Sequence, residues 1–76
     1  ARGVLQVDVA GPYLVVLHTA PAEASPVAIA LDRLAWSAVA GTIAGDDTIF
    51  LAVPGRKAQR AVVQRLREIA VVQATA

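Results

Sequence analysis

The chain has 76 residues, of which 57% are hydrophobic and 17% charged, and its formal net charge is +1. A chain of this length forms one small domain that buries only roughly 60% of its unfolded surface, so the surplus of apolar side chains points to contacts between subunits. The weak charge gives no basic field for holding nucleic acid, and apolar runs such as residues 13–17 are far shorter than the ~20 residues that span a bilayer.

Two further features bear on where the protein works. The basic start at Arg2 is not followed by the continuous apolar segment of a signal peptide, and the absence of cysteine fits a reducing compartment. We therefore expect a cytoplasmic protein. Because the chain begins at Ala1 and contains no methionine, we also expect it to be a piece of a longer protein.

The first part of the chain predicts a β-hairpin followed by a helix. Residues 4–9 alternate apolar and polar side chains, as a half-buried strand does, and Gly11-Pro12 forms a turn before a second strand at residues 13–19. Ser25 and Pro26 are predicted to be the N-cap and the first residue of a helix. Its apolar positions recur at helical spacing, and we expect it to end near residues 36–37.

The second part repeats the pattern. A third strand is predicted at residues 39–44, and Gly45-Asp46-Asp47 turns the chain into a fourth strand at residues 48–53. After Pro54-Gly55, an amphipathic helix is predicted over residues 56–70. Its cations are spread along the helix without interleaved aromatic residues, which is typical of a solvated helical face rather than of a nucleic-acid site.

The order ββαββα predicts an α+β fold with one domain over residues 1–76: a two-layer sandwich with both helices on one face of a four-stranded sheet. Tyr13, Val15 and Leu17 share one face of the second strand, whereas Leu14 and Val16 share the other. The fourth strand divides in the same way, with Ile49, Leu51 and Val53 opposite Phe50 and Ala52. Two helices cover only one face, so we expect another subunit to bury the second.

Two adjacent carboxylates, Asp46 and Asp47, stand at the glycine turn between the third and fourth strands, with no Lys or Arg within eight residues on either side. Crowding or burying like charges is unfavourable unless a cation arrives, so the pair indicates a positively charged ligand or partner. The chemistry of these residues favours an ordinary hairpin turn equally. A divalent metal is disfavoured, because no series of oxygen ligands spaced as in a calcium loop surrounds the pair.

Other polar residues give weaker indications. Asp32 in the first helix is either a solvated surface acid or a third carboxylate for the same ligand, and the residues alone favour the surface acid. His18 ends the second strand, and without cysteine or a second histidine it makes no zinc site. The chain lacks the cluster of titratable groups of an active site, so we expect no enzyme, no metal and no cofactor.

Residues 41–50, with the sequence GTIAGDDTIF, resemble the signature of the bacterial arginine repressor family, in its C-terminal arginine-sensing and oligomerising domain. His18-Thr19 matches the family segment before the first helix, and residues 30–34 match the pattern of that helix. The resemblance covers most of the chain. The ten-residue motif is highly specific, whereas its flanks match in pattern more than in identity.

The resemblance implies a ββαββα domain that trimerises, with two trimers stacking into a hexamer that binds L-arginine between them. The residues matching Asp46 and Asp47 serve the ligand in that family, one carboxylate reaching in from the opposite trimer. Asp32, Thr42 and the backbone of Ala44 match the positions that hold the rest of the amino acid. The resemblance also implies a regulator of arginine metabolism, whose preceding winged-helix domain, absent here, contacts operator DNA.

One position departs from the family pattern. Many members have a glutamine that contacts the ligand where this chain has Ser25, which is shorter and here favours a helix cap together with Pro26. Ser25 and His18 complete the candidate ligand-binding residues. Two alternatives remain open: a trimerisation scaffold whose Asp46-Asp47 pair is only a turn, and a pterin dehydratase-like enzyme of similar fold, disfavoured because the chain has a single histidine.

Overall fold

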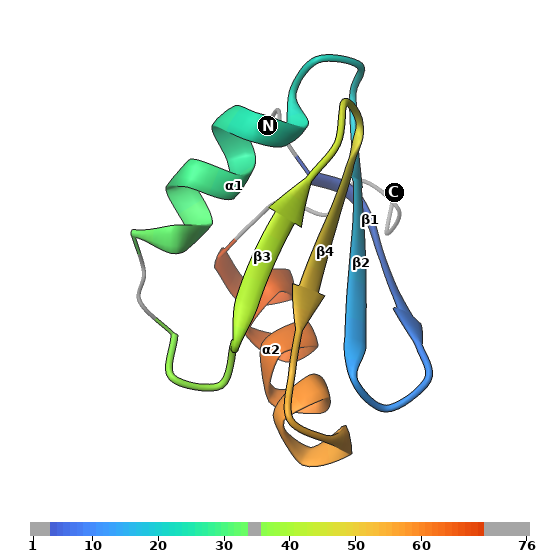
Figure 1. Cartoon of the computed structure of the whole chain (residues 1–76), viewed down its shortest axis with the longest axis vertical. Coiled ribbons are helices and arrows are strands. Elements are labelled where there is room, and N and C mark those ends of the chain that lie inside the picture. Colours follow the sequence, from blue (N-terminus) through green and yellow to red (C-terminus); the bar gives the residue numbers. More distant parts are fainter. Residues whose placement is uncertain (1–3, 34–35, 70–76) are drawn as a thin grey trace.

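The computed structural model describes residues 4–33 and 36–69, and within them the elements follow the predicted order ββαββα. The strands are β1 (Val4–Ala10), β2 (Leu14–Thr19), β3 (Gly41–Ala44) and β4 (Thr48–Ala52), and the helices are α1 (Ala24–Asp32) and α2 (Arg56–Ile69). The predicted α+β fold class is confirmed (Figure 1). No helix in the described ranges is long and apolar enough to cross a membrane.

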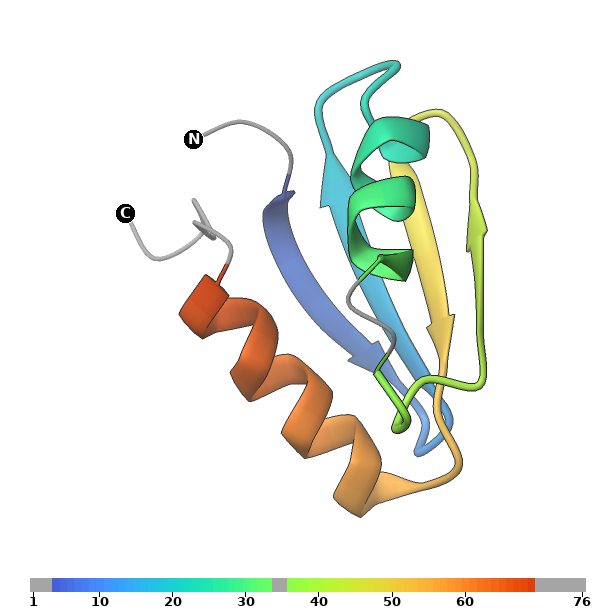
Figure 2. The ribbon, with the colours of Figure 1, turned by 90° about the vertical axis from the view of Figure 1, so that its left-hand side faces the viewer.

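The four strands form one antiparallel sheet in the order β1-β2-β4-β3. The two hairpins are joined through β2 and β4, where Leu17 pairs with Ile49, so β1 and β3 form the two edges. Both helices lie on the same face of the sheet (Figures 1 and 2). α1 packs over β3 and β4, while α2 packs over β2, as the predicted two-layer sandwich requires.

The core lies between the sheet and the helices. Val15 and Leu17 of β2 and Ile49 and Leu51 of β4 have at most 1% of their surface exposed, because alternation along each strand turns them to the helical side. The helices contribute buried apolar side chains at helical spacing, namely Ala24 and Ala28 from α1 and Val62 and Leu66 from α2. Strand alternation and helix amphipathicity therefore account for the core.

The opposite side of the sheet, which we call the open face, is covered by no described element. Its apolar members among the described residues are Ala10, Leu14, Val16, Ile43, Phe50 and Ala52. The register places Val16, Phe50 and Ile43 side by side on three neighbouring strands, and Phe50 and Ile43 are 46% and 74% exposed. The predicted division of the sheet into two apolar faces is confirmed at these positions. Burial of the open face by another subunit stays a prediction.

The predicted start of the first helix is wrong. α1 begins at Ala24 with Glu23 as its N-cap, and no side chain makes a capping hydrogen bond. The N–H of Ala24 donates to the backbone carbonyl of Asp46 at 3.1 Å, so the first N–H of the helix is satisfied by the β3–β4 turn. Pro26 fits as the third helical residue because the first-turn N–H groups have no partner within the helix.

The predicted end of the first helix is also wrong, because α1 stops at Asp32. Trp36 packs against the core, and its carbonyl accepts a hydrogen bond from the N–H of Val39 at 3.1 Å, which turns the chain toward β3. The other strand and helix boundaries agree with the prediction to within two residues. Ala70, predicted to be helical, lies outside the described residues.

Two residues near the β1–β2 hairpin depart from the predicted pattern. Tyr13, expected to share the buried side of the second strand with Leu17, lies in the turn before β2 and is 64% exposed. Gln59 of α2 is polar yet only 3% exposed. Its Nε2 donates to the carbonyls of Gly11 at 2.6 Å and Leu14 at 2.9 Å, so it ties α2 to the hairpin.

Candidate functional site

The β3–β4 turn, which carries the two adjacent carboxylates, is hydrogen-bonded to the segment that leads into α1. The N–H of Thr19 donates to the carbonyl of Asp47 at 2.8 Å, and the N–H of Ala24 donates to the carbonyl of Asp46 at 3.1 Å. Figure 1 shows this turn and the β2–α1 loop at the same end of the sheet. The backbone at the acidic pair is therefore held by partners far away in the sequence.

The side chains of the pair each accept one hydrogen bond but are not neutralised. Asp46 Oδ2 accepts a hydrogen bond from the N–H of Ala22 at 3.2 Å, and Asp47 Oδ1 accepts one from the hydroxyl of Thr48 at 3.0 Å. Both aspartates are exposed. Among the described residues, no Lys or Arg nitrogen lies within 4.0 Å of either carboxylate. Two negative charges thus stand together with acceptor capacity to spare.

The loop before α1 adopts an unusual backbone conformation beside Asp46. Ala22 has φ of 66°, in the left-handed region that residues with a side chain rarely enter. Its N–H makes the hydrogen bond to the Asp46 carboxylate. The turn and the loop therefore hold each other in place. The free-energy cost of the left-handed conformation of Ala22 falls at the candidate site.

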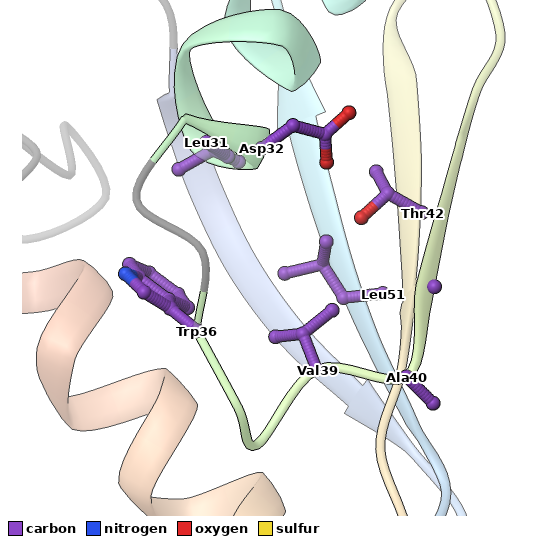
Figure 3. Close-up of a pocket in the computed structure, with 8 residues that line it drawn as sticks. Leu31, Asp32, Trp36, Val39, Ala40, Thr42 and Leu51 are labelled. Atoms are coloured by element: carbon purple, nitrogen blue, oxygen red, sulfur yellow. The ribbon is translucent and has the colours of Figure 1, made fainter.

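A second cluster of polar groups lies at the other end of α1, at a cavity of about 280 Å³. The cavity is lined by Leu31, Asp32, Trp36, Val39, Ala40, Gly41, Thr42 and Leu51. Figure 3 shows the carboxylate of Asp32 and the side chain of Thr42 turned toward each other, with Val39 and Leu51 beneath them. One carboxylate and one hydroxyl above an apolar floor suit a cationic or ammonium group attached to an apolar stem.

The structure does not bring these two clusters together within one chain. Asp32 lies eight residues after Ala24 in α1, which is about 12 Å along the helix axis. One protomer therefore presents two separate polar groups of residues, the Asp32–Thr42 cavity and the Asp46-Asp47 turn.

The remaining candidate residues are not among those that line the cavity. Ala44 ends β3, pairs with Ile49 and is partly buried against the core. Ser25 is exposed in the first turn of α1. His18 belongs to the row of side chains on the open face, where its Nε2 lies 3.3 Å from Asp8 Oδ2. The described residues include no group of three or more His, Asp or Glu that could hold a metal ion.

Reasoning from the sequence missed two residues of these clusters. Trp36 lines the cavity, and its indole Nε1 is buried without a hydrogen-bond partner in the described part of the chain. The usable signal was that it is the only tryptophan, placed between a helix and a strand. Ala22 carried no signal, because alanine is not a residue type associated with the left-handed conformation.

Comparison with known proteins identifies the same family that residues 41–50 resemble. Residues 1–68 match the family described as "Arginine repressor, C-terminal domain". An arginine repressor of Solibacter usitatus is 51% identical over 53 residues, which are 70% of this chain and 37% of the relative. Arginine repressors of Caldicellulosiruptor bescii and Moorella thermoacetica are each 46% identical over 56 residues, covering 74% of this chain and 37% of each relative. The chain thus spans well under half the length of these curated relatives.

Proposed function

The chain belongs to the arginine repressor family, and from that premise we propose that it binds free L-arginine and assembles copies of an arginine-responsive transcriptional regulator. The observation that carries this proposal is the exposed Asp46-Asp47 pair, held at a hydrogen-bonded turn without a neighbouring Lys or Arg among the described residues. Two fixed carboxylates of this kind complement a ligand that carries a delocalised positive charge.

A guanidinium suits the pair better than an ammonium does. It is planar and offers paired N–H donors that meet a carboxylate in a bidentate geometry, which lysine does not reproduce. Asp46 and Asp47 each accept one described hydrogen bond from the protein, so most of their acceptor positions are left for a ligand. Each charge-assisted hydrogen bond contributes about 1.5–3 kcal/mol net.

The proposed site is completed by a neighbouring protomer. The Asp32–Thr42 cavity holds the α-amino acid end of arginine, assisted by the backbone of Ala44. The guanidinium meets Asp46 and Asp47, at least one of them from the opposite trimer. The two clusters of one chain are separated by about 12 Å along α1. A single small ligand therefore reaches Asp32 of one protomer and an acidic turn of a neighbouring protomer more easily than it reaches both clusters of the same protomer.

Assembly then follows from the electrostatics of the site. We propose trimers that bury the open face, and two trimers that meet at the acidic turns. Without ligand, the carboxylates at this interface between trimers repel one another. Bound arginine forms hydrogen bonds with the same carboxylates and so joins the two trimers. Arginine therefore favours the hexamer through its higher affinity for that state. We further propose that a winged-helix domain outside this chain contacts operator DNA, since the chain matches only 37% of each of these relatives.

Calorimetric titration with L-arginine, L-citrulline and L-lysine tests the proposal, because citrulline keeps the shape of arginine and loses its charge. We expect arginine to bind and the other two to bind at least about tenfold more weakly, a difference of one charge-assisted hydrogen bond. Asp46→Asn is expected to weaken arginine binding by a similar factor while the melting curve stays the same. Glu68→Gln, which removes a carboxylate from an exposed position of α2 outside both clusters and the open face, is the control. Equal binding of all three compounds would exclude a guanidinium site.

The open face also favours a second candidate, a trimerisation scaffold without a ligand, because Phe50 and Ile43 are exposed whatever the acidic turn does. Sedimentation with and without arginine separates the two functions. A sensor shifts from trimer toward hexamer as arginine is added, whereas a scaffold keeps the same sedimentation coefficient.

A further inference from the structure

A groove lies between β1 and α2, on the helical side of the sheet. It has a volume of about 520 Å³ and is lined by Val9 of β1 and by one side of α2, namely Arg56, Gln59, Arg60, Val63, Gln64 and Arg67. Figure 2 shows α2 running beside β1. Val9 is 51% exposed although Val7, on the same side of the strand, is buried. The groove therefore has an apolar floor next to a basic wall.

The charge of the groove is strongly one-sided. α2 contains five of the seven Lys and Arg residues of the chain and a single acid, Glu68. No carboxylate is among the lining residues. Within the described ranges, none of the three lining arginines has a carboxylate oxygen within 4.0 Å, and Arg56 donates only to Gln59 Oε1, at 3.5 Å. These guanidinium groups are available to an anionic partner.

The groove runs beside an edge of the sheet. β1 pairs only with β2 among the described strands, so the backbone groups along its outer side have no ladder partner. Such an edge accepts an extended peptide as an additional strand, with main-chain hydrogen bonds supplying affinity and alternate side chains supplying specificity. A strand added to β1 would have one row of side chains on the helical side, facing α2.

The residues of α2 that line the groove have nearly the same spacing as the side chains on one side of such a strand. Helical residues four apart are separated by about 6 Å along the axis, and alternate residues of a strand are separated by about 6.7 Å. Arg56, Arg60 and Gln64, each four residues apart, therefore come into register with successive same-side residues of an extended chain, and Arg67 follows three residues later in the same lining. Acidic side chains at those alternate positions would meet three guanidinium groups.

We propose that this groove docks an extended acidic peptide segment of a partner protein, which adds to the edge of β1 and directs its carboxylates at Arg56, Arg60 and Arg67. A second copy of this chain does not supply the segment, because its six acids are dispersed and none alternate along an extended run. Nucleic acid would use the arginines but not the strand edge. The proposal is independent of arginine binding at the β3–β4 turn.

Defined probes test the two halves of the proposal on the unmodified chain. The main probe is a fluorescein-labelled peptide of four Glu-Val repeats. The control is its fully N-methylated form, which has the same charge but no backbone N–H group. We expect the Glu-Val peptide to bind at least about tenfold more tightly in fluorescence anisotropy, and the β1 amides to exchange more slowly in its presence. Equal affinity for both peptides, or tighter binding of a short DNA duplex, would overturn the proposal.

Matched variants test the position of the site. Arg60→Gln combined with Arg67→Gln is expected to weaken binding of the Glu-Val peptide about tenfold, near threefold for each partly exposed charge pair. Lys57→Gln combined with Arg65→Gln removes the same two charges from the same helix but outside the groove lining, and is expected to leave the affinity within about twofold. If both double variants weaken binding equally, the groove is not the binding site. A melting curve for each variant verifies that the fold is kept.

Discussion

The two faces of the sheet both carry large apolar side chains, and these end in opposite environments. On the helical face, Leu17 and Ile49 are completely buried, whereas on the open face Phe50 keeps 46% and Ile43 keeps 74% of its surface exposed. Ile49 and Phe50 are even neighbours on the same strand, β4. Hydrophobic character alone therefore does not determine burial within one protomer, and the difference indicates a second partner for the open face.

The comparison of the two faces is tested most strongly by the same substitution, leucine to alanine, made once on each face of β2. Leu17→Ala is expected to lower the free energy of unfolding by about 2–5 kcal/mol, because it leaves a cavity in the packed core. The measurement is urea unfolding at a concentration where the protein is a monomer. Leu14→Ala makes the same change on the open face, where the side chain is only half-buried, and is expected to cost clearly less.

The contrast between these two variants is itself informative. At high protein concentration, the cost of Leu14→Ala should rise toward that of Leu17→Ala if another copy buries the open face, because the reference state is then the assembly. A cost that is the same at low and high concentration would argue that the open face stays in water.

Local patterns in the sequence predicted both faces because strand alternation is a property of neighbouring residues. They failed where a distant group replaced a local one. Ser25 is a good N-cap by residue type, but the backbone carbonyl of Asp46 satisfies the helix start instead. The sequence indicates the acidic turn by its charge, whereas only the structure shows the backbone contacts of that turn with the loop before α1.

The burial of Gln59 is a second property that neighbouring residues in the sequence do not predict. Its position in α2 gives no sign that it is buried, because its partners, Gly11 and Leu14, lie more than forty residues away. Similarly, Val9 alternates in phase with Val7 but is exposed, since α2 packs over β2 and leaves this end of β1 uncovered. The packing of α2 on the sheet decided both outcomes.

Gln59→Leu tests how much the helical face depends on this polar contact. It is expected to lower the free energy of unfolding by about 1–3 kcal/mol, because two backbone carbonyls lose their donor. Gln64→Leu, the same change at an exposed position of the same helix, is the control and should stay within about 0.5 kcal/mol. If the two variants unfold alike, Gln59 does not hold the hairpin to α2.

Phe50→Thr has the smallest expected effect on the protomer and the most direct bearing on the comparison. Threonine is compatible with a strand, and the ring is half exposed, so unfolding of the monomer should change by less than about 1 kcal/mol. Self-association should nevertheless weaken at least tenfold, since burying an aromatic ring contributes about 1.5–3 kcal/mol for each copy in the assembly. Sedimentation equilibrium measures this change, with Tyr13→Thr as a control that removes an exposed aromatic ring outside the open face. Association that survives Phe50→Thr unchanged would mean that copies meet elsewhere, and the exposure of Ile43 and Phe50 would then need another explanation.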